Sequence, residues 1–182
     1  MSGLRPSVML YIVAVTVAAL AVLLAAVFYT GLPDRHQTMV ALLMTGFLIL
    51  ALRFPLHVGE KTKLVFDTSV LFAAVLLFGP AVAIVVAGSG MLAGQLLRRA
   101  SWVQMVFNSA QAMLQVAGAS LLMTAAGWQL GDLRLNQPAQ FLVIPLAVAV
   151  MYVINTSAVA IIVALQSGQP LRPVWQQSMR NL

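Results

Sequence analysis

The sequence predicts an all-α protein, a polytopic membrane helical bundle with about six membrane-spanning helices. Apolar residues make up 62% of the chain and charged residues only 8%, whereas an ordinary soluble domain has about 25% charged residues. The charges also fall in short clusters between long uncharged stretches, as expected when each stretch lies in a bilayer. We expect the whole chain, residues 1–182, to form a single membrane domain.

Charges, glycines and prolines bound the predicted spans. The first span contains no charge and ends near the turn residue Gly31. Arg53 and Pro55 close the shorter second span, Arg98 and Arg99 separate the fourth from the fifth, and a polar loop precedes the sixth. The six ranges are 8–29, 38–52, 64–78, 81–97, 103–126 and 141–165, followed by a polar cytoplasmic tail at 166–182.

The third and fourth spans come from one almost continuous apolar run at 64–97. As a single helix these 34 residues would reach about 51 Å at about 1.5 Å per residue, well beyond a hydrocarbon core of about 30 Å. Gly79-Pro80 breaks the run near its middle, which predicts two helices in a tight hairpin. Each half is short for a full crossing, so a re-entrant hairpin is the alternative.

The distribution of Lys and Arg predicts the orientation. With six spans, one end of the bundle carries eight of the ten positive side chains and the other end carries two. The positive-inside rule therefore predicts a multi-pass protein of the cytoplasmic (inner) membrane with both termini in the cytoplasm. The eight are Arg5, Arg53, Lys61, Lys63, Arg98, Arg99, Arg172 and Arg180, and the two are Arg35 and Arg134.

Several function classes find no support in the sequence. The net charge of +6 does not indicate nucleic acid binding, because the basic residues are scattered over many loops. The chain has no cysteine, which excludes disulfides and thiolate chemistry. His36 and His57 stand apart in loops, and no HExxH, Ser-His-Asp order or phosphate-binding glycine loop is present. We therefore expect a protein that is not an enzyme, without catalytic or metal-binding residues.

The clearest candidate site lies in the fifth predicted span. Gln104, Asn108, Gln111 and Gln115 follow one another at spacings of four, three and four, which places them on one face of a helix. Amides are costly against lipid, so this face is expected to point into the bundle or into a wet cavity. Two roles are open: hydrogen bonds between helices, or the lining of a ligand pocket.

Polar residues at two other places complete the candidate ligand-binding set. Asp67 lies at the edge of an apolar run and is expected to cap the third helix. The alternative role is a buried carboxylate that binds a cation or a polar ligand group. Tyr152 and Asn155 belong to a polar break deep in the sixth span. Asn155 is expected to reach another helix or to contact a ligand.

Small residues form two expected helix-packing faces. Gly88, Gly90 and Gly94 give the fourth span a small face, and the last two form a GxxxG pair. Ala14 and Ala18 begin a similar face in the first span. For both faces we expect packing within the chain, with dimerisation as the alternative.

Several short motifs carry a resemblance to a known family. They are Phe66-Asp67-Thr68-Ser69, Leu77-Phe78-Gly79-Pro80-Ala81, the Arg98-Arg99 pair, Val106-Phe107-Asn108-Ser109-Ala110-Gln111, and Asn155-Thr156 followed by Gly168 and Val174-Trp175. Over residues 60–182 the chain resembles the N-terminal membrane module of bacterial sensors with HD-GYP or diguanylate cyclase output domains. That module is in turn similar to the substrate-binding subunits of energy-coupling factor vitamin transporters.

The resemblance implies a membrane module that receives a ligand, but it carries over no signalling activity. Such sensors continue into a cytoplasmic output domain, whereas this sequence stops at Leu182. The residues that would perform the output chemistry are therefore not among those that match. The sequence predicts either the membrane part of a sensor or a stand-alone module that acts with a partner protein.

The leading functional prediction is a non-enzymatic membrane module of the sensory, signal-input type. It would bind a small ligand or a partner within its helical bundle and pass a change in helix packing to the cytoplasmic tail. The first alternative is the substrate-binding subunit of a transporter for a small, vitamin-like molecule, and the second is a structural accessory subunit. Expected partners are the lipid bilayer, a small molecule, another membrane or cytoplasmic protein, or a second copy of the chain. Nucleic acid is not expected, and the sequence leaves any cofactor open.

Overall fold

The computed structural model describes residues 4–31, 33–54, 56–57, 63–64, 67–128 and 138–180. Within these ranges the chain is helical apart from one two-residue antiparallel ladder, in which Leu56 pairs with Leu64. The elements are α1 (Pro6–Thr30), α2 (Arg35–Arg53), β1 (Leu56–His57), β2 (Lys63–Leu64), α3 (Asp67–Leu77), α4 (Pro80–Leu97), α5 (Trp102–Ala125), α6 (Pro138–Ser167) and α7 (Leu171–Arg180). The predicted all-α class is confirmed.

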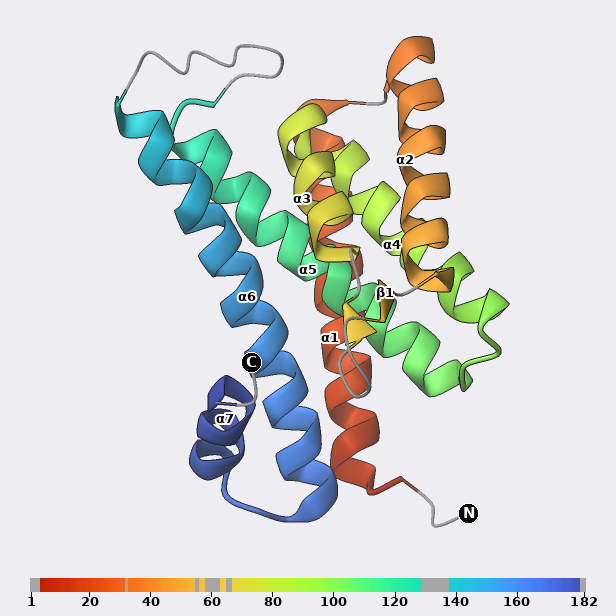
Figure 1. Ribbon diagram of the computed structural model, residues 1–182, viewed down its shortest axis with the longest axis vertical. Helices are drawn as coiled ribbons and strands as arrows, with labels where there is room; N and C mark the ends of the chain where they lie inside the picture. Colours follow the sequence, from red (N-terminus) through yellow and green to blue (C-terminus); the bar gives the residue numbers. More distant parts are fainter. Residues whose placement is uncertain are drawn as a thin grey trace.

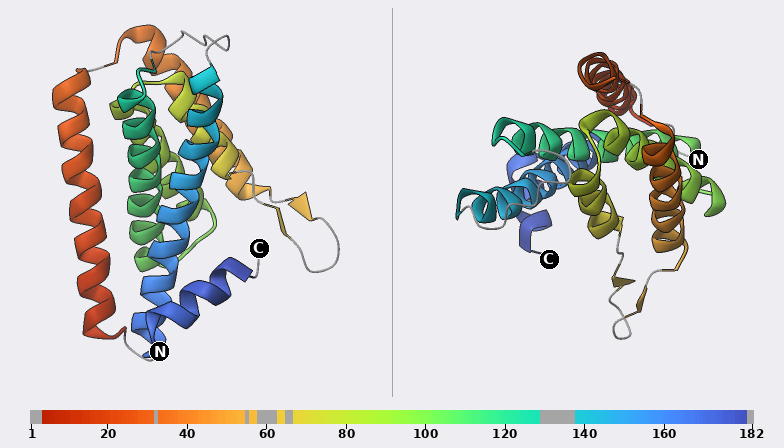
Figure 2. Two further views of the ribbon diagram at one scale, coloured as in Figure 1. Left: turned by 90° about the vertical axis from the view of Figure 1, so that its left-hand side faces the viewer. Right: turned by 90° about the horizontal axis from the view of Figure 1, so that it is seen from above.

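The first six helices form a bundle in which successive helices alternate in direction (Figure 1). α5 is the central helix and contacts α1, α3, α4 and α6. α1 stands at one side of the bundle, and α7 folds back beside the C-terminal part of α6 (Figure 2). This arrangement brings the ends of α2 and α4 and the beginnings of α3 and α5 to the same side of the bundle, away from the α3–α4 hairpin (Figure 1).

Among the residues that the structure describes, four helices are long and apolar enough to cross a membrane: α1, α2, α4 and residues Phe141–Ser167 of α6. α3 has only 11 residues, or about 16 Å of helix, which is short of a hydrocarbon core of about 30 Å. α5 has 24 residues, but with its polar side chains it is not among the helices apolar enough to cross. The structure therefore shows a helical bundle in which four of the six predicted spans are long and apolar enough to cross a membrane, and the six-span topology stays a prediction.

The predicted hairpin at Gly79-Pro80 is confirmed. α3 ends at Leu77, Gly79 is the N-cap of α4, and Pro80 occupies the first helical position, where its missing N–H would have had no partner in any case. The start of the third helix differs from the predicted range of 64–78, because Leu64 belongs to β2 and α3 begins at Asp67. The hairpin is consequently shorter on its α3 side.

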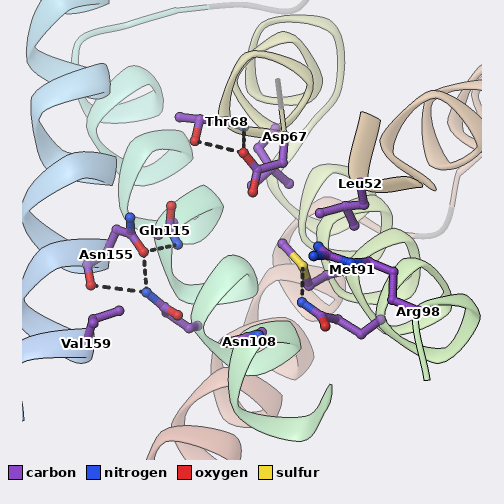
Figure 3. Close-up of a pocket in the computed structure, with 12 residues that line it drawn as sticks. Leu52, Asp67, Thr68, Met91, Arg98, Asn108, Gln115, Asn155 and Val159 are labelled. Atoms are coloured by element: carbon purple, nitrogen blue, oxygen red, sulfur yellow. Dashed lines mark hydrogen bonds between the residues drawn. The ribbon is translucent and has the colours of Figure 1, made fainter. Parts of the chain in front are cut away.

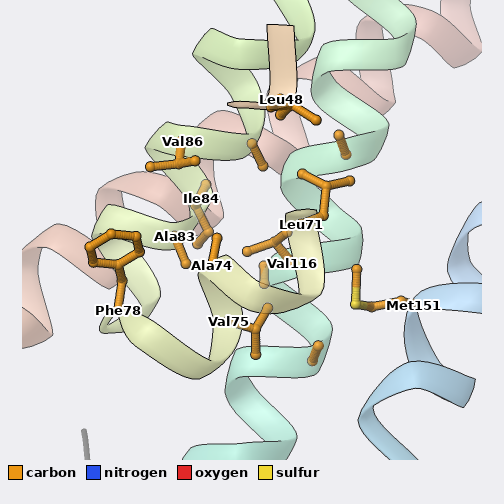
Figure 4. Packing of buried hydrophobic residues seen from close by; sticks show 14 of the residues in the cluster. Leu48, Leu71, Ala74, Val75, Phe78, Ala83, Ile84, Val86, Val116 and Met151 are labelled. Atoms are coloured by element: carbon orange, nitrogen blue, oxygen red, sulfur yellow. The ribbon is translucent and has the colours of Figure 1, made fainter. Parts of the chain in front are cut away.

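The core lies between α2, α3, α4 and α5, where large aliphatic side chains are almost fully buried (Figure 4). The glycines of α4 allow this close packing. A Cβ added at Gly90 would lie 2.7 Å from Leu48 Cδ2, and one added at Gly94 would overlap Leu52 Cδ1. Gly88 faces the Met113 side chain of α5 in the same way. Packing of the α4 glycines within the chain is therefore confirmed.

The alanine face of α1 is not a packing face within the chain. Ala14 and Ala18 are exposed, and the side of α1 that meets the bundle instead carries larger residues, among them Val8 and Ile12. These branched side chains bury more apolar surface than alanine does, which favours packing of their side of α1 against the bundle. The prediction of internal packing at Ala14 and Ala18 is wrong, and the dimerisation alternative stays a prediction.

The region predicted as a polar tail at 166–182 contains regular structure. α6 continues to Ser167, and α7 spans Leu171–Arg180. Gly168 allows the reversal between them with a φ of 73°, in the left-handed region that glycine adopts without strain.

Candidate functional site

A polar cavity opens between α3, α4, α5 and α6 at the end of the bundle where α4 ends and α5 begins (Figure 3). Its volume is about 230 Å³. Polar side chains from four helices line it, and a few apolar side chains close its walls. The lining residues are Leu52, Asp67, Thr68, Leu71, Met91, Gln95, Arg98, Asn108, Gln111, Gln115, Asn155 and Val159.

The amide face predicted in α5 points into this cavity at three of its four positions. Asn108 is half-buried, and Gln111 and Gln115 are buried, with exposed fractions of 4% and 7%. Gln104 differs because it lies in the first turn of the helix and is exposed. There it forms a capping box with Ser101, each side chain accepting a hydrogen bond from the other residue's backbone N–H at 3.3 Å.

Hydrogen bonds join the α5 amides to Asn155 of α6. The Gln111 Nε2 group donates to the Asn155 backbone carbonyl at 3.1 Å and also to its side-chain Oδ1. The Gln115 Nε2 group donates to the same Oδ1 at 3.5 Å. The predicted contact of Asn155 with another helix is confirmed. Because these bonds use the amide N–H groups, the side-chain carbonyl oxygens of the two glutamines still have acceptor capacity.

Asp67 lies at the first residue of α3 and on the cavity wall. Its Oδ1 accepts hydrogen bonds from the Thr68 backbone N–H at 2.8 Å and from the Thr68 hydroxyl at 3.4 Å. The carboxylate thus satisfies a first-turn N–H, as predicted for a cap. The alternative role, a buried carboxylate that binds a cation or a polar ligand group, stays a prediction, although the cap also lies on the cavity wall.

Gln95 and Arg98 complete the polar wall, and sequence reasoning missed both. Arg98 was interpreted only as a positive charge that ends the fourth span. Gln95 is the one polar side chain in the last turns of α4, and Arg98 follows at a spacing of three, which puts the two on one helical face. That spacing was the available signal. The Gln95 Nε2 group makes a weak contact with Met91 Sδ at 3.9 Å.

A second cavity of about 370 Å³ adjoins the first and shares three of its lining residues. It is lined by Gln95, Arg98, Ala100, Gln104 and Asn108. Gln104 therefore faces this outer cavity rather than the inner one. Tyr152 is half-buried on α6 and lines neither cavity, so the structure does not bring it to the candidate site.

Chemically, the inner cavity offers one carboxylate, one guanidinium and several amides to whatever occupies it. In the part of the chain that the structure describes, no three His, Asp or Glu side chains lie close enough to hold a metal ion. Comparisons with family models, with curated proteins and with solved structures found no match to this chain. The resemblance to sensor and transporter modules consequently stays a prediction.

Proposed function

We propose that this chain is a non-enzymatic, six-helix module of the cytoplasmic membrane that binds a small polar ligand between α3, α4, α5 and α6. In this proposal α1 to α6 all cross or enter the bilayer, and both termini face the cytoplasm. The alternation of helix direction in the bundle (Figure 1) and the excess of Lys and Arg at one end support that orientation.

The observation that carries the proposal is the polar cavity in an otherwise apolar bundle. Polar groups within a membrane protein are costly unless they pair with one another, line water or bind a ligand. The Gln111–Asn155 contact accounts for part of this cost. It leaves the half-buried Asn108 and Gln95 on the cavity wall, and helix packing alone does not require polar side chains at those two places.

The cavity dimensions and chemistry define the ligand class. At about 230 Å³ the space is smaller than the roughly 300–1,000 Å³ of sites for drug-sized molecules. Amides both donate and accept, a guanidinium pairs with anionic or carbonyl groups, and a carboxylate accepts from N–H or O–H groups. The expected ligand is a compact polar molecule with donors and acceptors on opposite sides, such as an amide-bearing heterocycle or a zwitterion.

A contact between α6 and α7 favours a sensory role. Asn155 faces the cavity, while Ser157, two residues later on α6, accepts a hydrogen bond from Trp175 Nε1 of α7 at 3.3 Å. A ligand that changes the position of α6 at Asn155 would thereby act on the helix that holds α7. Binding would shift the balance between two packings of α7, provided that the ligand prefers one of them.

The outer cavity supports the transport alternative. Because it shares Gln95, Arg98 and Asn108 with the inner cavity, it offers a polar route between the ligand position and the end of the bundle. A transport subunit needs such a route for release, whereas a sensor needs only reversible binding. The exposed alanine face of α1 is the feature that would serve a structural accessory subunit.

Native mass spectrometry of the chain purified from its membrane tests the proposal. We expect a small molecule to remain bound to the wild type. The ratio of ligand-bound to free chain should fall about tenfold or more in Asn108→Leu and in Gln111→Leu, since each substitution removes a polar partner from the cavity wall. Ser89→Leu is the matched control, because Ser89 is exposed on α4 and bonds only to its own helix at Val85. A chain that carries no ligand and is indifferent to all three substitutions would contradict the proposal.

A further inference from the structure

Two grooves meet where α6 turns into α7, at the end of the molecule opposite the bundle's α3–α4 hairpin. Their volumes are about 390 Å³ and 430 Å³, and both have Ile161 and Leu171 in their walls. The first is apolar apart from Ser157 and Arg172, and the second also carries Arg5, Ser7 and Gln169. The pair therefore shares an apolar wall and has a positive side chain on each side.

The sequence of α7 explains why this surface remains partly uncovered. Leu171, Val174, Trp175 and Ser178 recur at the spacing of one helical face. Val174 is buried in a small cluster on α6, and Trp175 is fixed by its hydrogen bond to Ser157. Leu171, at the beginning of the same face, remains 46% exposed. α6 thus buries only part of the apolar side of α7.

The length of α6 indicates the depth at which this surface lies. Its 30 residues extend about 45 Å, which exceeds a hydrocarbon core of about 30 Å by roughly ten residues. The last turns of α6, and α7 beside them, are then at the level of the lipid headgroups, where Trp and Arg are typical side chains. This step rests on α6 crossing the bilayer and not on the ligand of the polar cavity.

The charges at this surface complement an anionic headgroup. Arg172 is exposed, and Arg5 uses one of its five N–H donors on the Leu165 carbonyl at 3.3 Å. The two acidic residues in the described part of the chain, Asp34 and Asp67, line neither groove. The N-terminal end of the ten-residue α7, where Pro173 supplies no N–H but the other first-turn residues do, adds a partial positive charge beside Arg172.

We propose that the α6–α7 corner binds one anionic phospholipid. Its phosphate contacts Arg172 and Arg5, which suit phosphate oxygens through their planar arrays of donors. One acyl chain lies in the groove against Ile161, Leu171 and Trp175. Such a lipid fills the surface that α7 leaves open and holds α7 against α6, so the lipid composition of the membrane sets the position of the C-terminal helix.

Tryptophan quenching in vesicles tests this lipid site. With Trp102 and Trp128 changed to Phe, Trp175 is the only tryptophan left. Brominated phosphatidylglycerol, mixed into phosphatidylcholine vesicles, should quench Trp175 at a several-fold lower mole fraction than brominated phosphatidylcholine. Arg172→Gln and Arg5→Gln should each reduce this preference by about fivefold. Arg53→Gln, which removes an exposed charge from the end of α2, should leave it unchanged.

Equal quenching by the two brominated lipids would overturn the proposal, as would an effect of Arg53→Gln equal to that of Arg172→Gln. Native mass spectrometry supplies a second measurement without tryptophan substitutions. The wild type should retain one phosphatidylglycerol more strongly than phosphatidylcholine, and the Arg5→Gln, Arg172→Gln double variant should retain neither preferentially. The vesicles carry the same lipids in both leaflets, so the quenching result does not depend on the proposed orientation. Neither the quenching nor the mass spectrometry depends on the polar cavity.

Discussion

The contact between Gly90 and Leu48 allows a quantitative test of the bundle. A Cβ at Gly90 would lie 2.7 Å from Leu48 Cδ2 and 3.1 Å from Leu48 Cβ and Cγ, whereas carbon atoms in contact prefer about 3.5–4.0 Å. Leu48 is fully buried and cannot swing outward. Gly90→Ala must therefore move α2 away from α4, an overpacking that costs about 1–3 kcal/mol.

The matched control is Gly46→Ala on α2, where an added Cβ meets nothing within 4 Å. Both substitutions gain about 1 kcal/mol from the higher helix propensity of alanine. The difference between their free energies of unfolding therefore isolates the overpacking at Gly90. We expect Gly90→Ala to be less stable than Gly46→Ala by about 1–3 kcal/mol.

The assay is reversible unfolding in mixed micelles, with increasing mole fractions of a denaturing detergent and tryptophan fluorescence as the signal. A Leu48→Ala background should remove most of the difference, because it deletes the Cγ and Cδ atoms that the new methyl group meets. If Gly90→Ala and Gly46→Ala have the same effect on unfolding, the packing of α2 on α4 is not as described.

Three further predictions concern the α5–α6 interface and α7. Asn155→Ala removes the side-chain Oδ1 that accepts from the Gln111 and Gln115 amides and leaves the backbone acceptor in place. It should lower the free energy of unfolding by about 0.6–2 kcal/mol, with most of the loss recovered in the Gln111→Leu, Asn155→Leu double variant. Gly168→Ala imposes a φ of 73° on alanine and brings its Cβ to 2.8 Å from Arg5 Nη1. It should cost at least about 1 kcal/mol, and an Arg5→Ala background should relieve only the steric part. Trp175→Phe removes the N–H donor to α6 and should accelerate amide hydrogen exchange in α7 about fivefold, whereas unchanged exchange would show that this bond does not hold α7.

The features that sequence predicted well are those in which polar groups or backbone constraints stand out against an apolar background. The spacing of Asn108, Gln111 and Gln115 predicted a shared face, and the structure places all three at one cavity. Gly79-Pro80 predicted the turn between α3 and α4. In both cases the signal is independent of which side of a helix faces lipid.

The features that the sequence did not predict depend on which side of a helix faces lipid and which side faces its neighbours. Lipid is as apolar as a helix interface, so hydrophobicity alone does not separate the two sides of α1, and the alanine face was assigned to the wrong side. Arg98 was interpreted only as the end of a span, and Gln95 was not singled out, because the place of both at the cavity depends on how α4 packs against α5. The contact of α7 with α6 likewise follows from the reversal at Gly168, which brings distant residues such as Trp175 and Ser157 together.

Cysteine protection at Val159 tests ligand binding in the polar cavity most directly. The chain contains no cysteine, so Val159→Cys introduces a single thiol on the cavity wall without removing a polar side chain, and Gln176→Cys places one on the exposed side of α7. The small-molecule fraction of a cell extract should slow the reaction of a water-soluble maleimide with the thiol at 159 by at least about tenfold and leave that at 176 unchanged. Equal rates at position 159 with and without the extract would contradict the proposal that this cavity is a ligand site.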